Sequence, residues 1–364
     1  MSEIRILHIS LTKSLGGIAA YQKSLVSNID SDVFKLSFVT PYPDAMLIPF
    51  LNENGIKVYT IPSEKRVFSY FRELCRIMKN GNFDAVHIHK NSAVNPLPFL
   101  AAKLSGIKTV IAHSHNTSAT VGRAVGILHY VFRPIVRRIS TVHLACSSVA
   151  SDWMFGKNHP AKIVKNGIDV LKFSYDPDVR NAVRLELGIK DELLIGHVGN
   201  YIYQKNHKFM VEIMKKVIEI RPDAKLMFVG RGESLEEVKR YAEKIGVGEN
   251  ILFLGSRTDV NRLYQAMDVF LMPSFWEGLP IACVEAQAAG LPLLLSDVIT
   301  DEIVLTDKVY MVPLKNDASD WAEKLLEISN DGSRNNNESL LKESGYDASK
   351  SVKAVEDIYM LSKR

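Results

Sequence analysis

Residues 268–297 read DVFLMPSFWEGLPIACVEAQAAGLPLLLSD, two short apolar runs on either side of a segment rich in helix formers. Pro280 suits the first turn of a helix and Gly290 suits its end. A strand, a helix and a second strand in this order are typical of two parallel strands joined by a helical crossover. The stretch therefore predicts an α/β fold built on a parallel sheet.

The same alternation of short strand candidates and longer amphipathic segments runs through the chain twice. The first series is IRILHIS, KLSFVT, KVYTIP, DAVHIH, TVIAHSH and HLACSS, and the second is LLIGHVG, KLMFVG, ILFLG, DVFLMPS, LPLLLSD and VYMVPL. Turn signals at Asn166-Gly167 and Asp176-Pro177 mark a linker between the two series. A chain of 364 residues also favours more than one domain. We expect two doubly wound parallel-sheet domains, residues 1–172 and 173–345.

Composition indicates a globular protein with a large core. The apolar fraction is 46% and the charged fraction 24%, which argues against disorder. No run of eighteen apolar residues occurs, and the chain opens on a strand-like segment, so we expect a cytoplasmic protein. The three cysteines are far apart and predict neither a disulfide framework nor a zinc motif.

Charge is distributed unevenly between the halves. Residues 1–172 hold 21 lysines and arginines against 10 aspartates and glutamates, a net charge of +11, which leaves −7 for the remainder. No acidic residue lies between Asp84 and Asp152. The two halves are therefore expected to face different partners.

Residues 121–140, VGRAVGILHYVFRPIVRRIS, mix bulky apolar side chains with four arginines, Arg123, Arg133, Arg137 and Arg138. This charge density excludes a membrane span, but an apolar face flanked by arginines suits a helix in the headgroup layer of an anionic membrane. The alternative is a helix packed on its domain with the arginines in water.

In doubly wound sheets, ligands bind beyond the carboxyl ends of the strands. After the first strand, Gly16 and Gly17 open a predicted helix, whose free N–H groups attract an anion. A tight strand-to-helix turn is the alternative. In the second half, Gly199 and Lys205 follow a strand, and Lys205 can bind a phosphate or remain a solvated lysine. The Gly230-Arg231-Gly232 triplet resembles part of a dinucleotide fingerprint but lacks its full spacing.

Four histidines in the first half form two pairs, His87 with His89 and His113 with His115. Alternation along a strand places both members of a pair on one face, so a metal site is one interpretation. Neither pair has a neighbouring cysteine or carboxylate, and buried hydrogen-bonded histidines are the other interpretation. His113 and His115 lie where a strand gives way to its loop, which favours a functional role.

The two glutamates of the opening stretch are expected to act differently. Glu277 lies in the loop before the predicted helix, and Glu285 lies in its second turn. The EGLP sequence leaves backbone N–H groups at the helix start that suit a diphosphate. A carboxylate deeper in the helix can accept hydrogen bonds from the two hydroxyls of a ribose.

Taken together, these motifs closely resemble glycosyltransferase family 4, whose members have the two-domain GT-B fold and retain the anomeric configuration. The resemblance covers nearly the whole chain. Its principal motif is the pair Glu277 and Glu285, with seven residues between them and PSFW before them. Supporting motifs are GG at 16–17, KNGID at 165–169, QKNH at 204–207 and LSDVITDE at 295–302. HSHN and QKNH resemble the bacterial subgroup that builds exopolysaccharide and capsule repeat units.

The resemblance implies a role for each matching residue. Glu285 matches the glutamate that binds the donor ribose, Glu277 the one near the transferred sugar, and Lys205 the lysine on the diphosphate. The catalytic residues implied are His115, Glu277 and Lys205. Gly16, Asn200, Arg257, Gly278 and Leu279 complete the implied donor site, with Arg257 beside the nucleobase, and Gly17, His113 and Asn116 the acceptor site. The family usually has arginine where Asn200 stands, so the diphosphate must depend more on Lys205 or another cation.

The implied reaction transfers a hexosyl unit, with a UDP-sugar as the expected donor, to a glycan acceptor carried on a lipid diphosphate. The leaving phosphate would help to remove the acceptor proton during front-face attack, without a metal or other cofactor. A cleft between the two domains would hold the reactants, and a helix at about 346–364 would cross back onto the first domain. The expected partners include an anionic membrane surface, contacted through residues 121–140 at the inner face of the plasma membrane, and exclude nucleic acid. The alternative activity is a sugar-nucleotide epimerase on the same fold.

Overall fold

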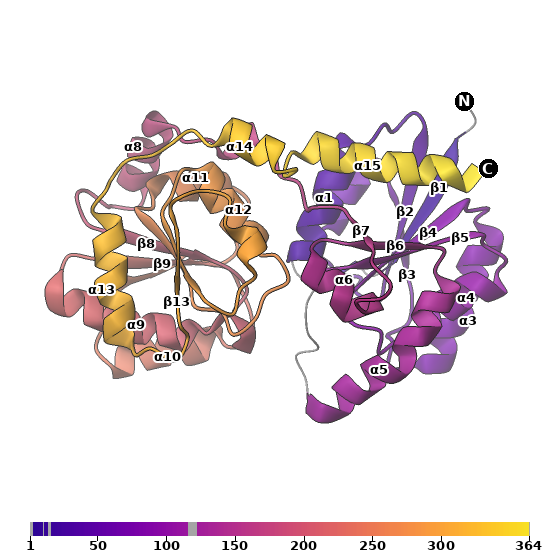
Figure 1. Ribbon diagram of the computed structural model, residues 1–364, viewed down its shortest axis with the longest axis horizontal. Coiled ribbons are helices and arrows are strands. Elements are labelled where there is room, and N and C mark those ends of the chain that lie inside the picture. The colour runs from indigo at the N-terminus through magenta and orange to yellow at the C-terminus, as the bar shows by residue number, and fades with distance from the viewer. Residues whose placement is uncertain (1–2, 10, 14–15, 116–121, 364) are drawn as a thin grey trace. The chain divides into compact units, whose positions relative to one another are not determined.

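The computed structural model describes residues 3–9, 11–13, 16–115 and 122–363, with only the backbone of 122–124. The chain divides into two compact units (Figure 1). The first unit comprises residues 1–167 together with 347–364, and the second unit comprises residues 168–346.

The described part of the first unit is built on a seven-stranded parallel sheet in the order β3-β2-β1-β4-β5-β6-β7. Its strands are β1 (Ile4–Ile9), β2 (Phe34–Thr40), β3 (Lys57–Thr60), β4 (Ala85–Lys90), β5 (Thr109–Ser114), β6 (Val142–Ala145) and β7 (Lys162–Ile163). Its helices are α1 (Gly17–Asn28), α2 (Ile48–Glu53), α3 (Val67–Asn80), α4 (Leu97–Leu104), α5 (Gly122–Ile139), α6 (Ser148–Phe155) and α15 (Ala348–Met360).

Helices cover both faces of this sheet and create two cores. On one face, α1, α2 and α15 bury side chains such as Leu25, Leu51 and Val355 against the strands. On the other face, α3, α4, α5 and α6 bury side chains such as Leu74 and Phe99. Since both faces are covered, most positions of the central strands β1, β4 and β5 are buried.

The described part of the second unit has a six-stranded parallel sheet in the order β10-β9-β8-β11-β12-β13. Its strands are β8 (Leu194–Val198), β9 (Lys225–Val229), β10 (Ile251–Phe253), β11 (Val269–Met272), β12 (Leu293–Ser296) and β13 (Val309–Val312). Its helices are α7 (Val170–Phe173), α8 (Pro177–Glu186), α9 (His207–Ile220), α10 (Leu235–Lys244), α11 (Val260–Ala266), α12 (Ile281–Ala288), α13 (Ala318–Ser329) and α14 (Glu338–Glu343). Helices α9, α10 and α13 pack on one face, and α7, α8, α11 and α12 lie on the other (Figure 1).

The chain returns to the first unit through α15, which packs on α1 and β1 (Figure 1). Asp347 caps this helix, and its carboxylate accepts a hydrogen bond from the Lys350 N–H at 3.0 Å. A Cβ at Gly167 would lie 2.7 Å from Cα of Ala348, so only glycine allows the two segments to approach so closely. The returning helix brings Tyr359 into the core beside β1.

All twelve strand candidates form strands, and the helix predicted between Pro280 and Gly290 is α12. Gly290, with φ of +68°, terminates that helix in the left-handed region. The sequence did not predict β7, since its two residues are exposed and carry no apolar pattern.

Candidate active site

The second unit has a topological switch point between β8 and β11. These strands are neighbours, and the strands that follow each of them, β9 and β12, lie on opposite sides of the pair. Such a point opens a crevice at the carboxyl ends of the strands. Lys205 lies after β8, in the short 3-10 helix η1 (Tyr203–Lys205), and Glu277 lies after β11. The order of the strands thus brings the two predicted residues to one place.

Hydrogen bonds fasten the loop after β8 to the loop after β11. The Phe275 N–H donates to the Gln204 carbonyl at 2.9 Å, and the Gln204 amide donates to the Trp276 carbonyl at 2.7 Å. Asn206 adopts a left-handed conformation at the start of α9, and its amide donates to the Pro273 carbonyl at 3.1 Å. Hydrogen bonds therefore connect the QKNH motif directly to the PSFW motif.

Lys205 and Glu277 form a salt bridge inside this structure. Lys205 Nζ lies 2.7 Å from Glu277 Oε1, and the two side chains are only 14% and 7% exposed. A charge-assisted hydrogen bond this sheltered from water fixes both groups in position. The site therefore presents one cation and one carboxylate at the edge of the sheet.

Glu285 lies in α12, as predicted, where Tyr264 of α11 holds its carboxylate. Tyr264 Oη lies 2.9 Å from Glu285 Oε2. Burial raises the pKa of Glu285 to about 7, and the Tyr264 hydrogen bond opposes this shift. Sequence reasoning missed Tyr264, because no motif connects it to Glu285 and only the packing of α11 on α12 does so.

The Gly230-Arg231-Gly232 loop packs directly on the loop that contains Asn200. A Cβ at Gly230, where φ is +152°, would lie 2.0 Å from the Gly199 carbonyl oxygen. The Tyr201 N–H donates to the Arg231 carbonyl at 2.9 Å. Glycine at 230 therefore permits a close backbone approach that brings Arg231 beside the loop of the uncharged Asn200.

Three more predicted donor residues, Arg257, Gly278 and Leu279, lie in the same unit. Arg257 lies after β10, and its guanidinium donates to Asp259 at 2.8 and 2.7 Å and to Glu186 at 3.2 Å. Gly278 and Leu279 lie in the turn that leads into α12, with the Leu279 side chain buried. Pro280 is the N-cap of that helix.

The remaining predicted residues belong to the first unit. Gly16 is the N-cap of α1 and Gly17 its first residue. His113 lies near the end of β5, and His115 follows that strand. Asn116 lies outside the described residues.

The two histidine pairs lie close together, and His8 on the neighbouring strand β1 lies with them. Ring nitrogens of His8, His87 and His89, and likewise of His89, His113 and His115, lie within 4.8 Å of one another. In the described residues neither group includes a carboxylate or a cysteine. His8 could have been found from its position in the strand-like IRILHIS segment.

Helix α5 contains most of the basic apolar segment 121–140; residue 121 and the side chains of 122–124 lie outside the described parts. Ile127, Tyr130 and Val131 are 64%, 56% and 57% exposed. Arg133 packs over the Tyr130 ring, and Arg137 donates to the Phe155 carbonyl at 3.2 Å. Among the described residues, no helix has the length and apolarity that crossing a membrane requires.

Each of the two units matches a protein-family model. Residues 15–171 match the model described as Glycosyltransferase Family 4, and residues 179–345 match Glycosyl transferases group 1. The protein named glycosyltransferase EpsF of Bacillus subtilis is 30% identical, over 99% of this chain and 97% of its own. The chain belongs to glycosyltransferase family 4. It is a glycosyltransferase, as the sequence motifs predicted.

Other relatives of this family 4 transferase give its context. The Escherichia coli UDP-Gal:alpha-D-GlcNAc-diphosphoundecaprenol alpha-1,3-galactosyltransferase is 24% identical, over 99% of this chain and 97% of its own. The crystal structure of Anabaena HepE in complex with UDP-glucose matches with a TM-score of 0.83 and 16% identity, over the full length of both chains. This likeness confirms the predicted GT-B fold.

Proposed function

We propose that this transferase moves a hexosyl unit from a nucleoside diphosphate sugar, with UDP as the nucleotide, to a lipid-linked glycan acceptor in exopolysaccharide or capsule biosynthesis. The observation that carries the proposal is the Lys205 and Glu277 pair at the switch point of the second unit. The E. coli relative, which by its name takes UDP-Gal and acts on a sugar on diphosphoundecaprenol, supports both the donor and the acceptor. The EpsF relative supports exopolysaccharide synthesis.

The donor diphosphate binds at the Lys205 ammonium and the amides of the turn that leads into α12. Both supply positive electrostatic potential where negative charge grows as the bond to the sugar breaks. Glu277 holds Lys205 and faces the hexose hydroxyls. Glu285, steadied by Tyr264, accepts hydrogen bonds from the ribose hydroxyls.

The sugar is transferred with retention of its anomeric configuration. The acceptor hydroxyl attacks from the face that the diphosphate leaves, and a phosphate oxygen takes its proton. The residues of this chain then bind, orient and stabilise charge, and His115 and His113 contact the sugar and the acceptor. Catalysis arises from positioning and from electrostatic stabilisation of the leaving diphosphate.

The acceptor lipid brings the enzyme to the cytoplasmic face of the membrane, where α5 docks. Its exposed residues Ile127, Tyr130 and Val131 lie at helical spacings of three and four and so form one apolar stripe. Arg138 is exposed at the end of the same helix. An apolar stripe with adjacent arginines suits an interfacial helix on anionic lipid.

Incubation with UDP-sugars, with and without lipid diphosphate-linked sugar acceptors, tests the proposal. We expect acceptor-dependent transfer, which Glu277→Gln slows much more than it weakens UDP binding. Turnover of a UDP-sugar to its epimer without acceptor would identify an epimerase instead. The relatives and the neighbour described above are not named as epimerases.

Metal independence is part of the same proposal, since Lys205 supplies the positive charge that a divalent cation would otherwise bring. We expect activity to survive excess EDTA with little loss. Loss of transfer on chelation, restored by magnesium or manganese, would contradict the metal-free mechanism.

A further inference from the structure

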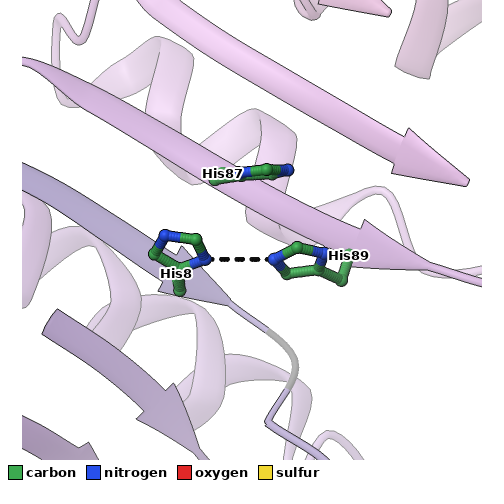
Figure 2. A group of neighbouring side chains, drawn as sticks. All are labelled: His8, His87 and His89. Carbon is green, nitrogen blue, oxygen red and sulfur yellow. Dashed lines mark hydrogen bonds between the residues drawn. The ribbon is translucent and has the colours of Figure 1, made fainter. Parts of the chain in front are cut away.

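Five histidines and one tyrosine gather on one face of the sheet in the first unit. They come from β1, β4, β5, the residue after β5, and α15: His8, His87, His89, His113, His115 and Tyr359. Figure 2 shows the centre of this group, where the rings of His8 and His89 are joined by a hydrogen bond and His87 lies beside them. We call the six residues the histidine chain.

One arm of the histidine chain runs from His113 to Tyr359. His113 Nδ1 lies 3.1 Å from His87 Nε2, and His87 Nδ1 lies 2.6 Å from Tyr359 Oη. The rings of His87 and His113 are stacked with their centres 5.2 Å apart. All three side chains are fully or almost fully buried.

The other arm runs from Tyr359 to His115. Tyr359 Oη lies 3.2 Å from His8 Nε2, and His8 Nδ1 lies 3.0 Å from His89 Nε2. His89 Nδ1 lies 2.9 Å from His115 Nε2. The hydrogen bonds are therefore continuous from His113 to His115, and every imidazole in the middle uses both of its nitrogens.

The imidazoles of the histidine chain are neutral near neutral pH. Burial lowers the pKa of His8 and of His115 to about 3, and it also moves the pKa of each of the other three well below its usual value. A neutral imidazole bears one proton, so one nitrogen donates and the other accepts. A neighbour that donates to one nitrogen thereby fixes the proton on the other.

This rule links the tautomers of all five histidines. If His113 carries its proton on Nδ1, it donates to Nε2 of His87, which must then carry its own proton on Nδ1. The Nδ1–H of His87 donates to Tyr359 Oη, and the Tyr359 hydroxyl donates to Nε2 of His8. In the same way, Nδ1–H of His8 donates to His89, and Nδ1–H of His89 donates to Nε2 of His115, whose own proton is then on Nδ1. Every hydrogen bond is made, and the Tyr359 hydroxyl also donates, only when all five protons are on Nδ1 or all five are on Nε2.

Tyr359 couples the two arms because its hydroxyl has a single proton. If His87 and His8 both donated to the phenol oxygen, that proton would have no acceptor among the described residues. If both presented lone pairs, one of them would be left without a donor. A buried polar group without a partner is costly, so the phenol accepts from one histidine and donates to the other.

We propose that Tyr359 is a positioning residue that couples the tautomer of His115 to that of His113 through the histidine chain, so that His115 Nδ1 and His113 Nε2 present opposite hydrogen-bonding roles to the substrate. The free ends of the chain are His115 Nδ1 and His113 Nε2, which have no partner among the described residues. Their rings are neighbours, with centres 4.1 Å apart. When one end donates the other accepts, the pair of roles that a sugar hydroxyl complements.

The change between the two arrangements conserves protons. One proton enters at His113 Nε2, each member of the chain passes one proton along its hydrogen bond, and one proton leaves from His115 Nδ1. The net charge of the chain is the same before and after. The role in substrate binding depends on the proposed transferase function, whereas the tautomeric coupling does not.

A metal ion explains this arrangement less well than hydrogen bonding does. Each ring nitrogen of His8, His87 and His89 already has a partner within 3.2 Å. A divalent cation would break these bonds, and in the described residues neither candidate group offers a carboxylate to neutralise it.

Nitrogen-15 NMR of the histidine-labelled full chain tests the coupling. We expect all five histidines to show the same proportion of the two tautomers. In Tyr359→Phe, His87 and His113 should still agree with each other, as should His8, His89 and His115, but the two sets should differ. Tyr70→Phe is the matched control, since it removes a buried tyrosine hydroxyl, bonded to Glu64 at 3.4 Å, on the other face of the same sheet.

Different tautomer proportions among the five histidines of the wild type would overturn the coupling. So would a metal ion that stays bound after chelation and perturbs the histidine shifts. The wild-type spectrum decides this even if the variant folds poorly. For the positioning role, Tyr359→Phe should lower the transfer rate about tenfold with UDP affinity unchanged, and Tyr70→Phe should alter neither. An unaltered rate in Tyr359→Phe alongside uncoupled tautomers would refute the positioning role, whereas absence of transfer in the wild type would refute the proposed function instead.

Discussion

Lys205 and Glu277 are 72 residues apart in sequence, yet the ammonium of one lies 2.7 Å from the carboxylate of the other. Each follows one of the two strands that flank the switch point of the second unit, and the loops around them share hydrogen bonds. Each of these two little-exposed charges is stabilised by the other, because water can solvate neither of them well. Neither residue can therefore be altered without affecting the other, which governs how variants must be designed.

Lys205→Met should weaken UDP binding by about tenfold or more and leave uridine binding unchanged, because we propose that the lost ammonium binds the diphosphate. It should also destabilise the fold by about 3 kcal/mol, since Glu277 loses its ammonium partner. Adding Glu277→Gln should recover part of that stability. Lys208→Met is the control, since it removes an exposed lysine paired with Glu237. Calorimetry and thermal unfolding measure both effects; equal losses for uridine and UDP would argue against a diphosphate role.

UDP-glucose binding should weaken as pH falls from 8 to 6. Burial raises the pKa of Glu285 to about 7, so the carboxylate that we propose binds the ribose is mostly ionised at pH 8 and mostly protonated at pH 6. At one pH unit below that pKa, the affinity for UDP-glucose should be lower by up to about tenfold. UDP-glucose is the preferred probe because its diphosphate lacks the ionisation that UDP has in this range. Glu285→Gln should bind more weakly and show no such pH dependence; a slope that persists in this variant would place the titrating group elsewhere.

Asn200→Arg should strengthen UDP binding severalfold, since it adds a cation in the loop that we propose binds the diphosphate. The variant side chain has to share its surroundings with Arg231, whose loop packs on Gly199 and Tyr201. Calorimetry on Asn200→Arg and on Arg231→Gln separates the two residues. Unchanged binding in the first variant, with a loss in the second, would show that Arg231 already supplies the charge.

Val131→Asp should abolish sedimentation with phosphatidylglycerol liposomes at low salt, because it places a charge in the exposed apolar stripe of α5. Arg138→Glu should reduce sedimentation and make it less dependent on salt. We choose Arg138 over Arg137 because Arg137 donates a hydrogen bond to the Phe155 carbonyl and its loss would also affect the fold. Leu185→Asp is the control, an exposed leucine of α8 in the second unit. UDP binding should stay intact in all three. Wild-type protein that stays in the supernatant, or that pellets equally with neutral lipid, would contradict membrane docking.

The sequence by itself determined the local structure of this protein. Runs such as VFLM and LPLLLS predict buried strands, and Pro280 and Gly290 delimit α12, because strand and helix preferences are expressed within a few residues. The same local motifs placed Lys205, Glu277 and Glu285 in loops and a helix next to strand ends. Their family resemblance then predicted the transferase class that the relatives confirm.

Only the tertiary structure decided which distant groups meet. Tyr264 reaches Glu285 because α11 packs on α12, and Tyr359 reaches His8, 351 residues earlier, because α15 returns to the first unit. No periodicity in the sequence records such a contact. It arises when separate segments bury their apolar faces together, and the polar groups carried into that core must then pair with whatever lies beside them.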